Sequence, residues 1–76
     1  MNKSRRKEIE KAMELLEEAQ GIIESCRDEE QDSYDNLPES IQDGERGQSM
    51  DEAISALDDC VENIEGAIES ASEAIE

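Results

Sequence analysis

The segment from Ser49 to Glu76 reads SMDEAISALDDCVENIEGAIESASEAIE and carries apolar residues at intervals of three and four. This spacing places the apolar side chains on one face of an α-helix. They belong to Met50, Ala53, Ile54, Leu57, Cys60, Val61, Ile64, Ala67, Ile68, Ala71, Ala74 and Ile75. The remaining positions include many acidic residues and no basic one. The segment therefore predicts a helix whose apolar side needs a partner.

A second amphipathic pattern, from about residue 3 to residue 33, supplies that partner. Its apolar residues are Ile9, Ala12, Met13, Leu16, Ala19, Ile23 and Cys26, flanked by Leu15 and Ile22. Written as heptads, one core position holds Ile9, Leu16 and Ile23, and the other holds Ala12, Ala19 and Cys26. The later helix repeats this, with Met50, Leu57 and Ile64 at one position and Ala53, Cys60, Ala67 and Ala74 at the other. Small residues at alternate layers predict close antiparallel packing.

Residues 34–48 are expected to connect the two helices. Leu37 precedes Pro38, which disfavours helical backbone at Leu37 and ends the first helix. Pro38 suits the start of a short helical turn. Ser49 and Glu52 match a capping box, which predicts that the second helix starts near residue 49, or one turn earlier. The chain is thus expected to be one all-α domain, an antiparallel hairpin over residues 1–76 with helices at about 3–33 and 49–76.

The two cysteines suggest how the helices are aligned. If Cys26 and Cys60 lie at the same level, the turn is centred on Asp43, and Asp43-Gly44 is itself a turn dipeptide. This register places Ile23 near Val61. Whether the two thiols ever form a disulfide is left open, although a reducing cytoplasm favours free thiols.

The connection also carries a resemblance. The run Tyr34-Asp-Asn-Leu-Pro-Glu-Ser-Ile-Gln42, followed by Glu45-Arg46-Gly47 and an acidic amphipathic helix, resembles a recurring set of short, uncharacterised bacterial and phage proteins. The resemblance implies a small helical hairpin of phage or prophage origin. It implies no catalytic residues.

Composition limits the classes of function. The net charge of −16 repels nucleic acid and anionic membranes, so any partner is expected to be cationic. The chain has no histidine, no CxxC pair and no Gly-rich phosphate loop, which argues against a zinc site, a catalytic triad and an enzyme. No apolar run reaches transmembrane length and no signal-peptide core is present, so a cytoplasmic protein without a cofactor is expected.

One acidic stretch imitates a calcium-binding loop. Asp28, Glu30, Asp32, Asn36 and Glu39 fall at ligand positions of a twelve-residue EF-hand loop. The sixth position, which requires glycine, is Ser33, and the stretch overlaps the first helix. No metal site is therefore expected.

The apolar stripes are wider than two helices require. We therefore expect two hairpins to pair into a homodimeric four-helix bundle, in an orientation that the sequence leaves open. The residues expected to form the core and the dimer contact are Ile9, Leu16, Ile23, Ile54, Leu57, Val61, Ile64 and Ile68.

The acidic faces are the candidate functional surface. Negative rows on both helices give a rod of charge that partly imitates nucleic acid, and several phage-encoded inhibitors of restriction and CRISPR enzymes are similar in charge and size. The expected function is non-enzymatic binding to a basic, nucleic-acid-binding host protein. The alternatives are a structural dimer with a merely solvating surface, or contact through the loop at 35–48. The candidate partner-binding residues are Glu14, Glu17, Glu18, Asp58, Asp59, Glu62, Glu65, Glu69 and Glu73.

Overall fold

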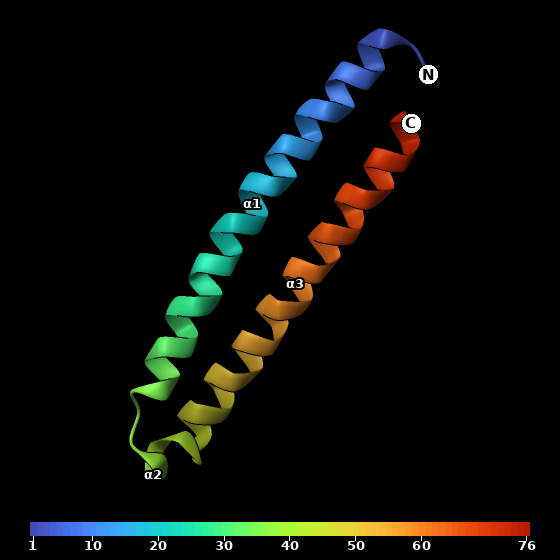
Figure 1. Ribbon diagram of the computed structural model, residues 1–76. Coiled ribbons are helices and arrows are strands. Elements are labelled where there is room, and N and C mark those ends of the chain that lie inside the picture. Colours follow the sequence, from blue (N-terminus) through green and yellow to red (C-terminus); the bar gives the residue numbers. More distant parts are fainter.

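Two long helices lie side by side and antiparallel in the computed structural model, which describes all residues from 1 to 76 (Figure 1). Helix α1 spans Lys3–Asp35, the short helix α2 spans Glu39–Gln42, and helix α3 spans Glu45–Ile75. The two chain ends lie at the same end of the hairpin, opposite α2 (Figure 1). The molecule is a rod of 58 × 15 × 13 Å. The all-α antiparallel hairpin expected from the sequence is confirmed.

Helix α1 begins and ends at residues whose chemistry favours a helix boundary. The Asn2 side chain accepts a hydrogen bond of 2.8 Å from the Arg5 backbone N–H, which satisfies one of the free donors of the first turn. At the other end the helix runs two residues beyond the expected 33 to Asp35. Gln31 donates a hydrogen bond of 3.0 Å to Asp35 in this last turn. Pro38 then stops the helix from continuing.

Helix α3 begins at Glu45, the earlier of the two expected starts, and not near Ser49, which the capping box favours. Ser49 lies inside the helix, so the Ser49–Glu52 pair does not cap it, and Gly44 occupies the N-cap position instead. Gly47 is buried and faces α2: a Cβ added there would overlap the Gln42 carbonyl group and lie 2.6 Å from the Gln42 Cα. The earlier start is possible because glycine lets the first turn approach α2 closely.

The side chains between the helices follow a heptad pattern that differs from the expected one by one row. Buried or half-buried positions recur at alternating intervals of four and three in α1, at Ile9, Met13, Leu16, Gln20, Ile23, Arg27, Glu30 and Tyr34. In α3 they recur at Gly47, Met50, Ile54, Leu57, Val61, Ile64, Ile68, Ala71 and Ile75. We call these two series the core positions, a and d of the heptad. Beside them, Ala19 and Gln31 of α1 and Ala53, Cys60 and Ser72 of α3 are half-buried as well.

One row of each helix differs from the expectation, although part of each expected row is half-buried. Ile9, Leu16, Ile23, Met50, Leu57 and Ile64 occupy core positions as expected. The second row of α1 is Met13, Gln20, Arg27 and Tyr34, and of the expected Ala12, Ala19 and Cys26 only Ala19 is half-buried. The second row of α3 is Ile54, Val61, Ile68 and Ile75; of the expected residues Ala53 and Cys60 are half-buried, and Ala67 and Ala74 are exposed. Branched side chains remove more apolar area from water than alanine does, and this favours the observed rotation of α3.

The core of a single hairpin is thin. Ile54, 5% exposed, is the one hydrophobic residue that is fully buried. Leu15 and Ile22 remain 57% and 59% exposed. Two helices can cover each other along one line of contact only, so most of the apolar surface stays at least partly in water.

The glycines inside the long helices provide a first prediction. Gly21 and Gly66 have nothing within 4 Å of an added Cβ, so neither marks a close contact. Replacing both with alanine is expected to raise the free energy of unfolding by about 1 kcal/mol per site, because alanine has the higher helix propensity. Thermal unfolding followed by circular dichroism would show a rise of roughly 4–8 °C per substitution. A fall in Tm would show that a partner packs against these positions.

Candidate functional site

The antiparallel arrangement sorts the flanking residues into two opposite faces. In an antiparallel pair, e positions of one helix lie beside e positions of the other, and g positions lie beside g positions. The e positions and the neighbouring b positions form one broad face. Its carboxylates, which we call the acidic face, are Glu10, Glu14, Glu17, Glu24, Asp28 and Asp35 from α1, and Asp51, Asp58, Glu62, Glu65, Glu69 and Glu76 from α3.

A shallow, open depression of about 420 Å³ lies on this face at the middle of the hairpin. It is lined by Glu24, Arg27, Asp28, Asp58, Val61 and Glu62. Residues from both long helices form it, and Val61 is the one hydrophobic member. The depression is therefore a charged hollow between two helices rather than an apolar pocket for a small molecule.

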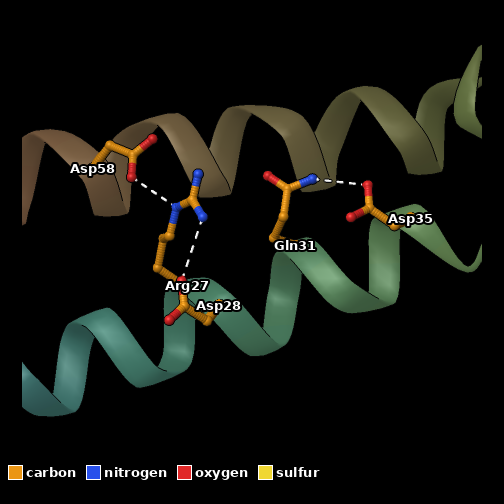
Figure 2. A network of polar contacts seen from close by, with 5 residues as sticks. All are labelled: Arg27, Asp28, Gln31, Asp35 and Asp58. Atoms are coloured by element: carbon orange, nitrogen blue, oxygen red, sulfur yellow. Dashed lines mark hydrogen bonds and ion pairs between the residues drawn. The ribbon is translucent and has the colours of Figure 1, made fainter.

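Arg27 joins the two helices across this depression (Figure 2). Its Nε donates a hydrogen bond of 2.8 Å to the Asp58 carboxylate, and its Nη1 lies 3.4 Å from the Asp28 carboxylate. The hydrogen bond to Asp58 raises the pKa of the Arg27 guanidinium above its ordinary value. Two carboxylates around one guanidinium leave the centre of the face negative.

The ion pair joins side chains that water still reaches. The side chain of Arg27 is 31% exposed, that of Asp58 is 52% exposed and that of Asp28 is 72% exposed. Solvent screening makes exposed pairs of this kind small contributors to stability. Their geometry matters more, because Arg27 occupies a core position and joins α1 to one particular carboxylate of α3.

A second polar core residue also joins the two helices. Gln20 donates a hydrogen bond of 3.3 Å from its Nε2 to the backbone carbonyl of Val61. Polar residues at single core positions are known to specify helix register at some cost in stability. The Arg27–Asp58 contact lies within one residue of the alignment expected from the cysteines, whereas the Gln20–Val61 contact lies five residues from it along α3. The thiols of Cys26 and Cys60 are free.

Sequence reasoning missed Gln20 and Arg27 because both are polar. Each nevertheless follows Met13 at a multiple of seven residues, as does Tyr34. A heptad count that tolerated polar residues would have placed them in the core.

The structure divides the predicted partner-binding residues into two groups. Those on the acidic face are Glu14, Glu17, Asp58, Glu62, Glu65 and Glu69. The others, Glu18, Asp59 and Glu73, occupy f positions on the outer edges of the rod, away from the neighbouring helix. The acidic face therefore brings together six of the predicted side chains, and it adds carboxylates such as Glu24 and Asp28 that the depression includes.

The acidic side chains do not gather into a metal-binding cluster. No group of three or more histidine, cysteine, aspartate or glutamate side chains is arranged to hold a metal ion. Most of the stretch that imitates a calcium loop, up to Asp35, belongs to the regular helix α1. No helix contains an apolar segment long enough to cross a lipid bilayer.

Comparison with known proteins identifies no relative. No protein-family model, no curated protein and no solved structure matches the chain.

Proposed function

We propose that the protein is a non-enzymatic binding protein whose acidic face occupies the nucleic-acid site of a basic host protein. The observation that carries the proposal is the collection of carboxylates from both long helices on one side of the rod, with Arg27 already neutralised by Asp28 and Asp58. Acidic side chains spread evenly around a helix would solvate it equally well. Their concentration on one face creates a directional negative potential, which steers a cationic surface towards it.

The spacing of these charges supports a comparison with nucleic acid. The acidic face extends over about 27 helical residues, or roughly 40 Å at ~1.5 Å per residue. Its carboxylates therefore follow one another along the axis at about 3.4 Å, compared with ~3.4 Å for the phosphates of one DNA strand and ~1.7 Å for both strands together. The face thus has the linear charge density of a single strand, on a rigid support.

Binding is a better match to this surface than catalysis. The depression at Arg27 is shallow and open to water, whereas a catalytic carboxylate needs a water-poor site in which its pKa is tuned. A phage or prophage origin, as the loop resemblance implies, would fit an inhibitor of this kind.

The test is a capture experiment that compares two triple charge reversals. Glu62, Glu65 and Glu69 lie within two turns of α3 on the acidic face, and the variant Glu62→Lys, Glu65→Lys, Glu69→Lys is expected to weaken capture of a basic protein from bacterial lysate by at least about tenfold. The reason is that attraction becomes repulsion at the contact. Capture by the wild-type protein is expected to fall with rising salt and to be competed by duplex DNA.

The control is the variant Glu52→Lys, Asp59→Lys, Glu73→Lys. It changes the net charge equally on the same helix, but at f positions on the outer edge. It is expected to retain most of the capture. Equal loss in both variants would mean that net charge alone attracts the partner, and unchanged capture in both would move the contact to the loop at residues 35–48.

A structural or assembly module is the second candidate. The thin core, with Ile54 as its one fully buried hydrophobic residue, favours it, because such a hairpin gains most by associating. Under this alternative no basic protein is captured at low salt, and both triple reversals leave the biological readout unchanged.

A further inference from the structure

The face opposite the acidic one is almost free of charge. It consists of the g positions and the neighbouring c positions of both long helices. We call it the uncharged face and define it by Ala12, Leu15, Ala19, Ile22 and Cys26 of α1, and by Ser49, Ala53, Ala56, Cys60, Asn63, Ala67, Ser70 and Ala74 of α3. Charged residues make up 39% of the chain, yet none falls at these positions between residues 12 and 26 or between residues 49 and 74.

We propose that the uncharged face binds a second copy of this chain, face to face. This inference is independent of the partner proposed for the acidic face. The proposed dimer contact differs from the one expected from the sequence. Ile54, Val61 and Ile68 pack inside the hairpin, whereas Leu15 and Ile22 are exposed and available for the dimer.

The exposed area agrees with what a dimer needs. The chain exposes 5617 Å², about 900 Å² more than the ~4,700 Å² expected of a compact protein of its mass. The uncharged face is about 37 Å long on α3 and about 21 Å long on α1, and each helix is about 10 Å wide, which gives roughly 580 Å². A stable interface covers about 800 Å² on each partner. A dimer contact of that size therefore takes in the whole of the uncharged face.

The sizes of the side chains indicate how the two copies lie on each other. On α1 the uncharged face carries large residues, Leu15 and Ile22, which are more than half exposed. On α3 it carries small ones, such as Ala56, Cys60 and Ala67. A two-fold axis parallel to the helices lays α1 of one copy over α3 of the other, so that large side chains enter the spaces between small ones. All neighbouring helices in this four-helix bundle are antiparallel.

The charge distribution is compatible with self-association. In the proposed dimer both acidic faces point outwards, on opposite sides of a bundle about two helices thick, roughly 20 Å. This separation exceeds the Debye length of about 8 Å at physiological salt. Repulsion between two chains of charge −16 is therefore largely screened, and the dimer is expected to strengthen as salt is added.

The same arrangement brings the cysteines together. Arg27 pairs with Asp58, so the neighbouring Cys26 and Cys60 lie at one level of the hairpin. With the axis parallel to the helices, Cys26 of one copy faces Cys60 of the second copy at that level. With the axis perpendicular to the helices, Cys26 faces the region of Ala12 instead, more than 15 Å along the rod by about 1.5 Å per residue.

Sedimentation equilibrium tests whether the uncharged face forms the contact between the two copies. The wild-type protein is expected at twice its 8.5 kDa mass at tens of micromolar. The variant Leu15→Lys, Ile22→Lys is expected to dissociate at least about a hundredfold more readily, because two exposed apolar anchors become charged. Lysine lowers the net negative charge, so added repulsion cannot explain the loss. The control Glu18→Lys, Ser25→Lys has the same seven-residue spacing at f positions, and its self-association is expected to change less than about threefold.

The lysine variant can lose its fold together with the dimer, so a milder variant accompanies it. Leu15→Ala, Ile22→Ala is expected to show a Tm that rises with protein concentration, as the wild type does. A wild-type protein that remains monomeric up to about 100 µM, with a Tm independent of concentration, overturns the proposal. So does a lysine variant that dimerises as tightly as the wild type.

Disulfide formation tests the orientation. Cys26→Ser and Cys60→Ser variants are mixed, allowed to exchange subunits and oxidised with diamide. If the axis is parallel to the helices, we expect a covalent dimer in the mixture. Either variant alone is then expected to form little covalent dimer. Efficient linking of either variant alone, or none in the mixture, overturns that orientation.

Discussion

Replacing Gly47 with alanine is expected to lower the free energy of unfolding by about 2–3 kcal/mol, although alanine is ordinarily the better helix former. An added Cβ would overlap the Gln42 carbonyl group, which is backbone and cannot rotate aside as a flexible side chain does. The first turn of α3 must then move away from α2 or unwind. Thermal unfolding at fixed protein concentration should show a fall in Tm of roughly 10–20 °C.

The matched control is Gly21→Ala, the same substitution in a helix with open space around it. It is expected to raise Tm, so the two variants should move in opposite directions. Hydrogen exchange locates the damage: in Gly47→Ala, the amides of residues 48–51, which donate to the carbonyls of the first turn beginning with Gln48 to Gly44, should lose protection, while the helix restarts at the Ser49–Glu52 capping box. A Gly47→Ala protein as stable as Gly21→Ala would show that α2 does not pack against the start of α3.

Replacing Ile54 with alanine is expected to cost about 2–4 kcal/mol. Ile54 is 5% exposed, and removing three of its carbons leaves a cavity in the best-packed layer of the hairpin. A domain of this size has little stability to lose, so much of the population should unfold at room temperature. Urea denaturation followed by circular dichroism at 222 nm measures the effect directly.

The control for that variant is Ile41→Ala, which removes the same atoms from a side chain that is 38% exposed in the short helix α2. A loss below about 1 kcal/mol is expected there, because little apolar area returns to water. If both variants lose the same free energy of unfolding, the layer around Ile54 stabilises the protein no more than the exposed end of the hairpin does.

The helices and their pairing could be predicted because they depend on patterns along the chain. Apolar residues at intervals of three and four define the helices, and Pro38 and Gly44 mark the break between them. The alignment through Cys26 and Cys60 came within one residue of the contact between Arg27 and Asp58. These features need no knowledge of how side chains interlock.

The errors arose where two neighbouring rows of residues competed for the core. Ala53 and Ile54, or Cys60 and Val61, both face roughly towards α1, and a rotation of about 100° around the axis exchanges them. The packed structure places the branched residues centrally. It also puts Gln20 and Arg27 in the core, which a search for apolar residues alone does not find. The start of α3 depended on the close approach of Gly47 to Gln42, a tertiary contact without a local sequence signal.

The rotation of the rows changes how the surfaces are interpreted. With Ile54, Val61 and Ile68 inside the hairpin, the alanines and cysteines move to one flank and most of the acidic side chains move to the opposite flank. The hairpin thus presents one charged and one uncharged face along the same rod. Self-association through the uncharged face leaves a dimer with two acidic faces, each free to contact a cationic partner.

An NMR experiment on a mixed sample examines this division of the surface most directly. One half of the protein is labelled with ¹³C and the other half is unlabelled, and an isotope-filtered spectrum records contacts between copies only. We expect cross-peaks between the methyl groups of Leu15 and Ile22 and those of Ala67 and Ala74, and none from residues beside Glu62 and Glu65. Intermolecular contacts through the acidic face, or none at concentrations where the protein is helical, would contradict the account.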